Sequence, residues 1–306
     1  MDEAKTEEIV AVGKASADAI MMAASLVKPG VRLMEVAEKA EAYMKGKGYG
    51  LAFPLNISVN CVAAHYTPTL GDRAVFSHDD VVKIDFGAEK NGVLGDGALT
   101  VDLSGKHAKL LEAAEKALDN ALATVKAGTE VRKIGRVVAE TVEALGFKPI
   151  RNLGGHAIEE NDLHSGAFIP NYDNGDTAVL EEGALVAIEP FVTTQSGAGM
   201  VKENGINEIY NYLGSLPVRA QSARALLAEI ENKYSKNPFA VRWLSNIDSS
   251  WFGLYSGISE LVRARCIESN PVLAEARDGI VAQAEAELIV ERDGCRIITL
   301  ARPQRA

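Results

Sequence analysis

The sequence predicts an α+β protein built from two similar halves, each with two helices followed by antiparallel strands. Three observations predict this class. A helical segment recurs at a constant offset, β-rich sequence follows each copy, and a further helical segment interrupts the second set of strands. The chain has 306 residues, of which 47% are hydrophobic, so each half can bury a core of its own.

The recurring segment covers residues 28–49 and, 98 positions later, residues 126–147. The glycines keep this offset, which favours duplication over chance similarity of two amphipathic helices: Gly30 matches Gly128, and Gly48 matches Gly146. Each copy follows another helical stretch, and the glycine between them is typical of one helix ending before the next begins. We therefore expect a helix pair at the start of each half, with first helices at residues 4–26 and 106–124.

Strands are expected after each pair, at residues 57–67, 81–87 and 93–103 and then at residues 184–194 and 284–293. Between the last two ranges lies a polar, helical segment at residues 210–271. Its apolar stripe consists of Ala225, Leu226, Ile230 and Tyr234. We interpret this segment as an insertion into a hairpin loop, because the entropy cost of closing a loop grows slowly with its length.

Composition and charge argue against several classes of protein. The net charge of −10 disfavours direct binding of nucleic acid through its phosphates. The three cysteines lie far apart without a CxxC pair, which fits a reducing compartment and argues against a thiolate zinc site. The first ten residues are acidic and unlike a signal peptide, and no uninterrupted apolar run of eighteen residues predicts a membrane span. A cytoplasmic protein is expected.

Two aspartates are placed by a predicted hairpin. Asn91-Gly92 between two apolar runs is a strong signal for a two-residue turn. With these residues at the turn, position 90 faces 93 and position 85 faces 98, so Asp85 and Asp96 share one face of the sheet. Such diagonal neighbours lie about 7–8 Å apart, close enough to lean onto a pair of metal ions. A buried carboxylate in the apolar run VVKIDF needs a partner, and a metal ion is one.

The second half offers counterparts. The string LVAIEPF resembles VVKIDFG, so Glu189 takes the place of Asp85. The late strand should provide the counterpart of Asp96, either Glu285 or Glu287, which share parity and which periodicity does not separate.

Histidines are the remaining polar candidates. His156 lies among glycines that let the backbone approach a site, and a neutral imidazole suits a fifth ligand. His65 and His164 also lie near glycine or proline, whereas His78 and His107 are expected to be exposed residues without a role. Four carboxylates and one imidazole form a hard donor set that suits Mn, Co or Fe, and Zn less well. Two such ions can bridge a hydroxide and support hydrolysis.

At these residues the sequence resembles a known family. The strings AFPLNISVNCVAAHYTP, VVKIDFG, NLGGHAIE, AIEPF and GIVAQAEAELIVE are similar to those of type II methionine aminopeptidases in their short archaeal form, members of metallopeptidase family M24. The resemblance runs in order through the chain and includes the helical insertion. It implies the pita-bread fold, with one catalytic domain over residues 1–306 and an inserted subdomain at residues 210–271.

The resemblance also implies roles for individual residues. Two divalent ions (Co, Mn, Fe or Zn) would be held by Asp85, Asp96, His156, Glu189 and Glu285, a set that selects Glu285 over Glu287. Glu189 would also shuttle the proton. His65 and His164 would contact the substrate, orienting the scissile amide and stabilising the oxyanion, and Phe53 and Leu163 would receive the methionine side chain.

The implied activity is removal of the initiator methionine from nascent proteins with a small second residue, through attack of a bridging hydroxide on the scissile carbonyl. The expected partners are N-terminal peptides of nascent proteins, with the ribosome as a further candidate, and neither nucleic acid nor membrane. A monomer is the default expectation.

Some positions depart from the family pattern. Gly95-Asp96-Gly97 stands where the family usually has Ala-Asp-Thr, and Ala284-Glu285-Ala286-Glu287 stands where it usually has Phe-Glu-His-Thr. A threonine and a histidine that could support the ligands are therefore missing, and Asn270 replaces a frequent tyrosine. We expect an active enzyme whose metal affinity and pocket differ from the family norm.

Two alternatives remain. An X-prolyl aminopeptidase or prolidase of the same fold would need the same ligands but usually carries a separate N-terminal domain. A non-catalytic relative that binds ribosomes or RNA would lack intact ligands, and the negative charge of this chain also speaks against it.

Overall fold

The computed structural model describes residues 3–302, which form six α-helices, one short 3-10 helix and several small antiparallel sheets. The first half contains α1 (Glu3–Leu26), α2 (Leu33–Gly46) and strands β1 to β7. The strands are β1 (Gly50–Leu51), β2 (Asn56–Val59), β3 (Val62–Ala64), β4 (Val81–Asp85), β5 (Ala88–Lys90), β6 (Val93–Leu94) and β7 (Ala98–Asp102).

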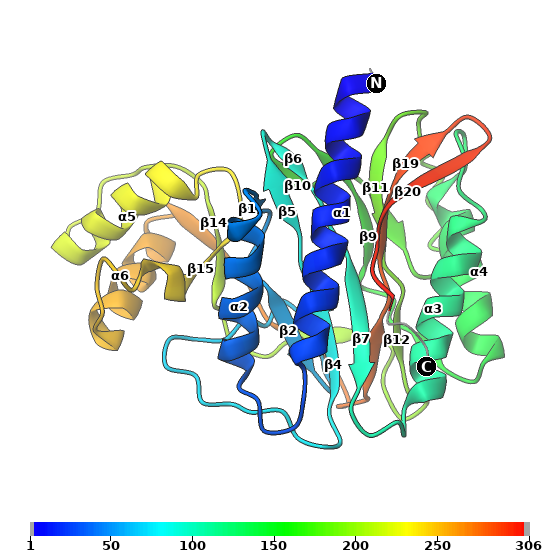
Figure 1. The fold of residues 1–306 in the computed structure, drawn as a ribbon, viewed down its shortest axis with the longest axis horizontal. Coiled ribbons are helices and arrows are strands. Elements are labelled where there is room, and N and C mark those ends of the chain that lie inside the picture. Colours follow the sequence, from blue (N-terminus) through cyan, green and yellow to red (C-terminus); the bar gives the residue numbers. More distant parts are fainter. Residues whose placement is uncertain (1–2, 303–306) are drawn as a thin grey trace.

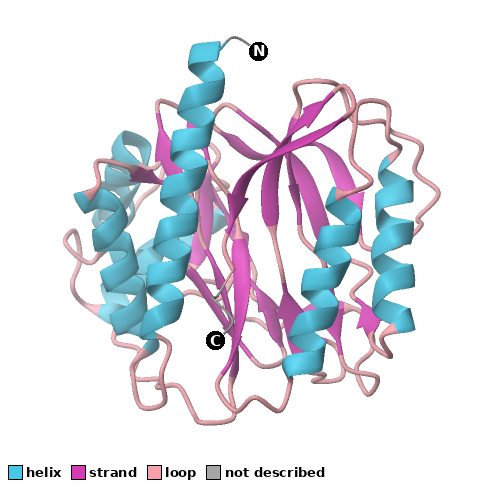
Figure 2. Cartoon of the chain, turned by 45° about the vertical axis from the view of Figure 1, so that its right-hand side comes forward, coloured by secondary structure: helices cyan, strands magenta, loops and turns pink. Residues whose placement is uncertain are grey.

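The second half repeats this order. Its helices are α3 (Ala108–Leu122) and α4 (Val131–Ala144). Its strands are β8 (Lys148–Pro149), β9 (Gly154–Glu159), β10 (Asp162–Pro170), β11 (Leu185–Ile188), β12 (Phe191–Thr193), β13 (Val201–Glu203), β17 (Leu273–Glu275), β18 (Val281–Gln283), β19 (Ala286–Glu291) and β20 (Gly294–Leu300). The four helices lie on the outside of the strands, as Figures 1 and 2 show, and α3 and α4 stand beside the α1–α2 pair. The α+β prediction is confirmed.

The duplication predicted from the sequence is visible in the backbone. Helix α4 begins and ends 98 positions after α2, the offset of the sequence repeat. The preceding glycines have the same left-handed conformation, with φ of 82° at Gly30 and 81° at Gly128. Each donates its N–H at 2.8 Å to a loop carbonyl, that of Phe76 for Gly30 and that of Leu180 for Gly128. The turn between the two helices is therefore held in the same way in both halves.

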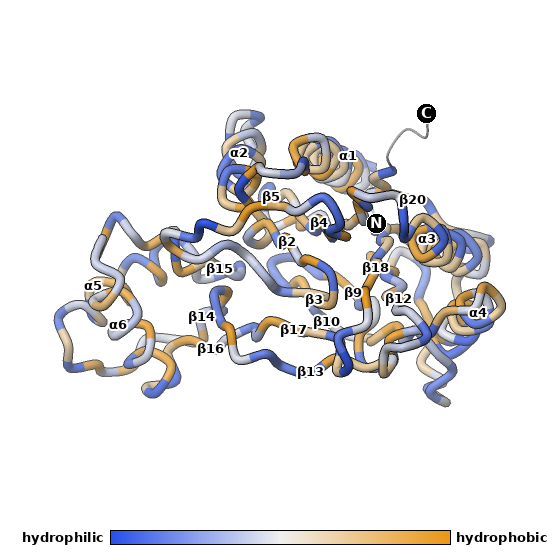
Figure 3. The backbone as a smooth tube through the Cα atoms, turned by 90° about the horizontal axis from the view of Figure 1, so that it is seen from below, coloured by the Kyte–Doolittle hydropathy of each residue, from blue (hydrophilic) through white to orange (hydrophobic). Residues whose placement is uncertain are grey.

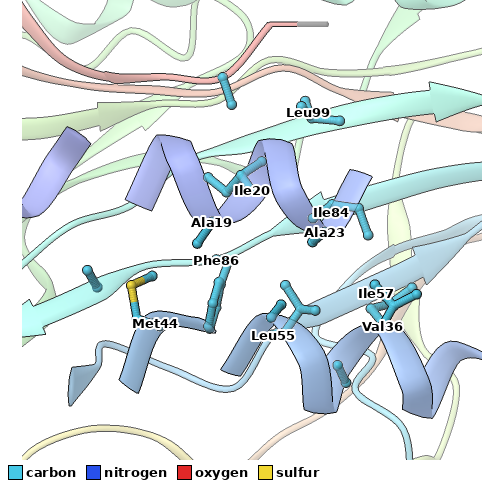
Figure 4. Packing of buried hydrophobic residues seen from close by; sticks show 14 of the residues in the cluster. Ala19, Ile20, Ala23, Val36, Met44, Leu55, Ile57, Ile84, Phe86 and Leu99 are labelled. Atoms are coloured by element: carbon cyan, nitrogen blue, oxygen red, sulfur yellow. The ribbon is translucent and has the colours of Figure 1, made fainter. Parts of the chain in front are cut away.

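Each helix pair covers its own core. In the first half, Ala19, Ile20 and Ala23 of α1 pack with Val36 and Met44 of α2 over the strands, as Figure 4 shows. Beneath them lie Ile57, Ile84 and Leu99 of the strands, together with Leu55 and Phe86, which flank β2 and β4. A second cluster joins α3 and α4 to β11, β12, β18 and β19 in the same manner.

Helix α1 is also long and apolar enough, by length and composition alone, to cross a membrane. Its 24 residues include six charged ones (Glu3, Lys5, Glu7, Glu8, Lys14 and Asp18), and 44% of its most apolar 18-residue stretch is buried inside the protein. Its buried face includes Gly13, where an added Cβ would lie 2.2 Å from Ile298 of β20. These contacts are typical of a helix in a protein core, and such helices meet the same criteria of length and apolar composition as membrane spans.

Hydrogen bonds between β7 and the residues before β19 join the two halves. Thr100 donates its hydroxyl to the Gln283 carbonyl at 2.7 Å and accepts the Gln283 N–H at 2.9 Å. The Glu285 N–H donates to the Ala98 carbonyl at 3.1 Å. The candidate ligands Asp96 and Glu285 lie next to this seam.

A third region lies at one end of the molecule, seen beyond α2 in Figures 1 and 3. It contains α5 (Gln221–Lys233), the 3-10 helix η1 (Val241–Leu244) and α6 (Trp251–Arg263), with a sheet of β14 (Ile209–Tyr212), β15 (Phe239–Ala240) and β16 (Ile267–Asn270). It has its own hydrophobic cluster. The predicted stripe of α5 was wrong at Ala225, which is exposed; the helix instead buries Ala223, one turn before Leu226 and Leu227.

A buried ion pair ties this region to the first half. Arg242 of η1 pairs with Glu41 of α2 and donates to the Thr67 hydroxyl at 2.6 Å. The indole N–H of Trp243 donates to the other Glu41 oxygen at 2.8 Å. Because Thr67 is two residues after His65, this network fixes the loop that carries the histidine.

Candidate metal centre

The first two candidate ligands come from the predicted hairpin. Asp85 is the last residue of β4, and Asp96 lies in the bend between β6 and β7. The register is the predicted one, with Asp85 opposite Ala98 and Lys90 opposite Val93. At Gly87, an added Cβ would lie 1.8 Å from the Gly95 carbonyl oxygen, so only glycine allows the strands to approach here.

The second half provides two glutamates from an equivalent place. Glu189 follows β11 and Glu285 precedes β19. Ile188 pairs with Ala286 and Phe191 pairs with Gln283, so the two glutamates lie between these pairs, facing each other across the strands.

The candidate imidazole comes from the neighbouring strand. His156 is in β9, where it pairs with Ala187 of β11. Its ring thereby lies beside the strand that leads to Glu189.

The structure brings these five side chains to one cavity of about 390 Å³. One ligand atom from each of Asp96, His156 and Glu285 lies within 4.8 Å of the other two, a spacing that suits a shared metal ion. His156 Nε2 is 3.4 Å from Asp96 Oδ2 and 3.7 Å from Glu189 Oε1. Asp85 lines the same cavity, and its Oδ1 is buried without a hydrogen-bond partner.

The electrostatics of this cluster call for a cation. Asp96 is 4% exposed and Glu285 is 2% exposed. The pKa values of Asp85, Glu189 and Glu285 are raised well above their usual range, first by burial and then by the nearby charge of Asp96. Divalent ions would offset this repulsion, and carboxylate oxygens with one imidazole nitrogen are donors that such ions accept. The residues present therefore fit a divalent metal site.

His65 and His164 line the same cavity. His65 has a left-handed φ of 65°, and its Nδ1 lies 3.2 Å from the Pro271 carbonyl oxygen. The ring of His164 meets that of His156 edge to face, with centroids 4.4 Å apart. Burial lowers the pKa of both His65 and His164; the Pro271 contact opposes this at His65, whereas the charge of His156 lowers both pKa values further, so the site favours the neutral form of each ring.

An apolar wall lies beside the charged cluster. Phe53 and Leu163 are buried together in a small cluster with Ala52, Leu94, Ile158 and Ala187, and both line the cavity. Of the other two histidines, His78 is exposed as expected, whereas His107, which precedes the first turn of α3, is half-buried because it packs at the start of that helix; neither lines the cavity.

Comparisons with known proteins agree with this arrangement. The sequence pattern described as "Metallopeptidase family M24" matches residues 7–210. Methionine aminopeptidase from Methanocaldococcus jannaschii is 41% identical over 293 residues, which cover 96% of this chain and 98% of the relative. Methionine aminopeptidase from Archaeoglobus fulgidus is 42% identical over 299 residues, which cover 98% of this chain and 100% of the relative.

The chain belongs to metallopeptidase family M24. It is therefore a hydrolase that uses divalent metal. The membership of family M24 that the sequence motifs predicted is confirmed.

Solved structures share the fold of this M24 peptidase. A thermophilic Arx1 superposes with a TM-score of 0.81 at 16% identity, covering 98% of this chain and 92% of the other. Methionine aminopeptidase from Thermotoga maritima gives 0.72 at 21% identity, with 98% of both chains covered. The prolidase from Pyrococcus furiosus gives 0.63 at 17% identity, with 99% of this chain but 65% of the other covered. The pita-bread prediction is confirmed.

Several residues around the M24 site were not predicted. The Gln283 amide donates to Glu189 Oε2 at 3.3 Å and to Glu285 Oε2 at 3.1 Å, which joins the two glutamates. Asn56 lines the cavity directly opposite Asp85 in the β2–β4 register. Asn56 could have been found from strand pairing, whereas Gln283 requires the turn before β19 to be known.

The departures from the family pattern have structural counterparts. Glu287 lies away from the cavity and accepts the Asp96 N–H at 3.1 Å and the Thr299 hydroxyl at 3.0 Å. At Gly97 an added Cβ would lie 2.5 Å from Thr299 Cγ2. In this M24 chain, Thr299 and Glu287 thus fill the space behind Asp96 and support its backbone.

Proposed function

We propose that the protein removes the N-terminal methionine from nascent proteins whose second residue is small. The observation that carries the proposal is the convergence of four carboxylates and one imidazole on a cavity that also contains two neutral histidines and an apolar wall. Methionine aminopeptidase is the name of the full-length relatives at 41–42% identity.

The proposed ligands are Asp85, Asp96, His156, Glu189 and Glu285, holding two divalent ions. The hard donor set favours Mn, Co or Fe, with Zn less favoured. Such ions supply Lewis acidity, which activates a water molecule for attack and polarises the scissile carbonyl. Metal-free protein loaded with one metal at a time, followed by anomalous scattering from crystals, would count the ions and identify the best activator.

The remaining steps belong to side chains of the chain. Glu189, which lines the cavity beside the other proposed ligands, would carry a proton from the attacking water to the leaving amine. The Pro271 carbonyl accepts from His65 Nδ1–H, so His65 Nε2 is left as an acceptor for a substrate N–H. His164 is then the candidate donor to the developing oxyanion.

Substrate selection follows from the shape of the cavity. The apolar wall of Phe53 and Leu163 would receive the unbranched methionine side chain. A large second residue would crowd the space between the histidines. Comparing Met-Ala-Ser with Met-Trp and Met-Leu peptides tests this, and rapid cleavage of the latter two would contradict the proposal.

Two further functions are weaker candidates. An X-prolyl aminopeptidase or prolidase shares the fold, but this chain covers 65% of the Pyrococcus furiosus prolidase. Cleavage of Ala-Pro-Ala in preference to Met-Ala-Ser would favour it. A non-catalytic relative that binds ribosomes or RNA would leave the carboxylate cluster unused. Failure to bind any of the four metals by calorimetry would favour that second candidate.

The domain and partner assignments belong to the same proposal. We treat residues 1–306 as one catalytic domain with an inserted subdomain at residues 210–271, a monomer that acts on N-terminal peptides of nascent proteins in the cytoplasm. The separate hydrophobic cluster of the inserted region supports this division.

A further inference from the structure

Strand β10 is interrupted beside the candidate catalytic histidine. It is the edge strand of the five-stranded sheet and pairs with β9 on one side. Ser165 pairs with Ala157, and Phe168 pairs with His156, the next residue back along β9. Gly166 and Ala167 are therefore extra residues without a partner on β9, and we call them the β10 bulge. Bulges leave the backbone groups of the extra residues unpaired and often lie next to active sites.

The backbone of the β10 bulge is accessible in the cavity. Gly166 is exposed and lines the cavity, as does Ala167. Glycine has no side chain, so the exposed surface of Gly166 is peptide backbone. Its φ of +57° is a conformation that glycine adopts without strain. Within residues 3–302, no backbone–backbone hydrogen bond from outside the β9–β10 ladder reaches Gly166 or Ala167.

The residues on the two sides of His164 along β10 differ in character. On the N-terminal side of His164, Leu163 is buried in one apolar cluster with Phe53, and both line the cavity. On the C-terminal side, the β10 bulge leads to Phe168, which lines the cavity and is 43% exposed. A substrate with its methionine side chain against the apolar cluster would extend its chain along Gly166–Phe168.

We propose that the β10 bulge binds the substrate through main-chain hydrogen bonds to the residues that follow the scissile bond; this inference rests on the proposed function. A strand advances about 3.3 Å per residue, in the enzyme and in an extended peptide alike. A scissile carbonyl at His164 therefore places the second and third residues after the scissile bond opposite Gly166 and Ala167. Main-chain pairing does not read side chains, which suits an enzyme whose substrates differ beyond their second residue.

Methylated peptides test the pairing without altering the fold. The parent is Met-Ala-Ser-Ala amide, compared with two analogues that carry one N-methyl group, on the serine or on the final alanine. In an extended peptide alternate N–H groups point to the same edge. One analogue should raise KM about fivefold or more, the cost of one hydrogen bond, with kcat little changed, and the other should resemble the parent.

Met-Ala dimethylamide separates this inference from the proposed function, because it keeps the small second residue but has no N–H beyond the scissile bond. Cleavage of the parent and both analogues with equal efficiency would overturn the bulge proposal alone. An equal loss for both analogues would also overturn it, since that result indicates crowding. If neither the parent nor the dimethylamide is cleaved, the proposed function fails and the inference fails with it.

A protein variant provides a second test of the bulge proposal. Phe168→Ala removes the exposed ring that borders the bulge, and it should raise KM for the parent peptide more than KM for Met-Ala dimethylamide. Ile297→Ala is the matched control, because Ile297 is 44% exposed but lies on β20 away from the cavity. It should leave both substrates unaffected. Equal effects of Phe168→Ala on both substrates would contradict a role beyond the scissile bond.

Discussion

At the scale of single residues, Asp85 shows most directly what the cavity requires. Its Oδ1 is buried and has no hydrogen-bond partner, and burial raises its pKa. A charge in this position is costly unless a cation neutralises it.

Asp85→Asn should therefore lower kcat/KM by more than about 100-fold, the upper range for groups that only support metal ligands, while the fold is kept. Asparagine has nearly the same size but carries no negative charge for the metal. Peptide hydrolysis and metal binding by calorimetry would check this. Asp79→Asn is the control, because Asp79 is exposed and pairs with Lys106 at 2.7 Å. Normal activity in Asp85→Asn would refute its assignment as a ligand.

His65→Ala and His164→Ala should each retain the metal content of the parent but lose activity. Removal of one group that stabilises a transition state costs about 10²–10³-fold in kcat. Metal analysis together with steady-state kinetics measures both effects. His78→Ala, at an exposed position, should behave like the parent. Loss of metal from either variant would reassign that histidine as a ligand.

The sequence allowed much of the site to be predicted at this scale, but not the contacts that depend on turns. Period-two alternation puts Glu285 and Glu287 on one face, so it could not separate them. In the structure Glu285 precedes β19 and lines the cavity, whereas Glu287 lies within the strand and supports Asp96. Both glutamates lie near Asp96, as their shared parity implies, but only Glu285 reaches the cavity, and alternation does not specify how far along the strand the cavity extends.

At the scale of elements, the two helix pairs provide an internal comparison. Gly135 in α4 corresponds to Ala37 in α2, and Gly46 in α2 corresponds to Ala144 in α4. An added Cβ at Gly135 would lie 2.2 Å from the Tyr172 carbonyl oxygen, whereas at Gly46 it would meet nothing within 4 Å. The duplicated helices have diverged where α4 must approach the loop after β10.

Gly46→Ala should raise the free energy of unfolding by about 0.4–1 kcal/mol, because alanine restricts the unfolded chain and favours helix. Gly135→Ala should lower it by about 1–3 kcal/mol through overpacking against backbone. Urea denaturation of both variants measures the difference. If Gly135→Ala were as stable as the parent, α4 could move away from the β10 loop, and the close packing would not be a constraint.

Element boundaries were predicted best where the duplication supplied two copies of the same signal. The hairpin register followed from Asn91-Gly92 alone, because the turn type fixes which residues face each other. The stripe of α5 was wrong at Ala225, since a small side chain is equally compatible with either face of a helix. The Arg242–Glu41 pair joins residues about 200 positions apart, and no local pattern indicates it.

At the scale of the whole molecule, the buried carboxylates make stability depend on metal and pH together. In the metal-free protein the pKa values of Asp85, Glu189 and Glu285 lie above their unfolded values of about 4. The folded state then binds more protons than the unfolded state above that pH. The free energy of unfolding of metal-free protein should therefore fall as pH rises through the raised pKa values.

Metal binding should reverse this trend, because the ions displace those protons. At a concentration a hundredfold above its Kd at pH 8, Mn or Co should stabilise the fold by about 2.7 kcal/mol, and the same concentration should stabilise it less at pH 6, where protons compete for the ligands and Kd is higher. Thermal unfolding with and without a chelator at both values measures it. Asp79→Asn should show the same difference as the parent, and Asp85→Asn a smaller one. A gain that did not vary with pH would contradict the linkage.

The contact between α1 and β20 has a consequence for how activity arises. Helix α1, the first of the described chain, packs against β20, the last strand. Glu285, which lies where β7 meets the residues before β19, belongs to the final fifth of the sequence. A growing polypeptide can fold its early helix pair, yet it has no complete ligand set until the closing hairpin docks. Catalytic competence should therefore arrive in a single late step, and hydrolysis should report completed assembly more faithfully than helix content does.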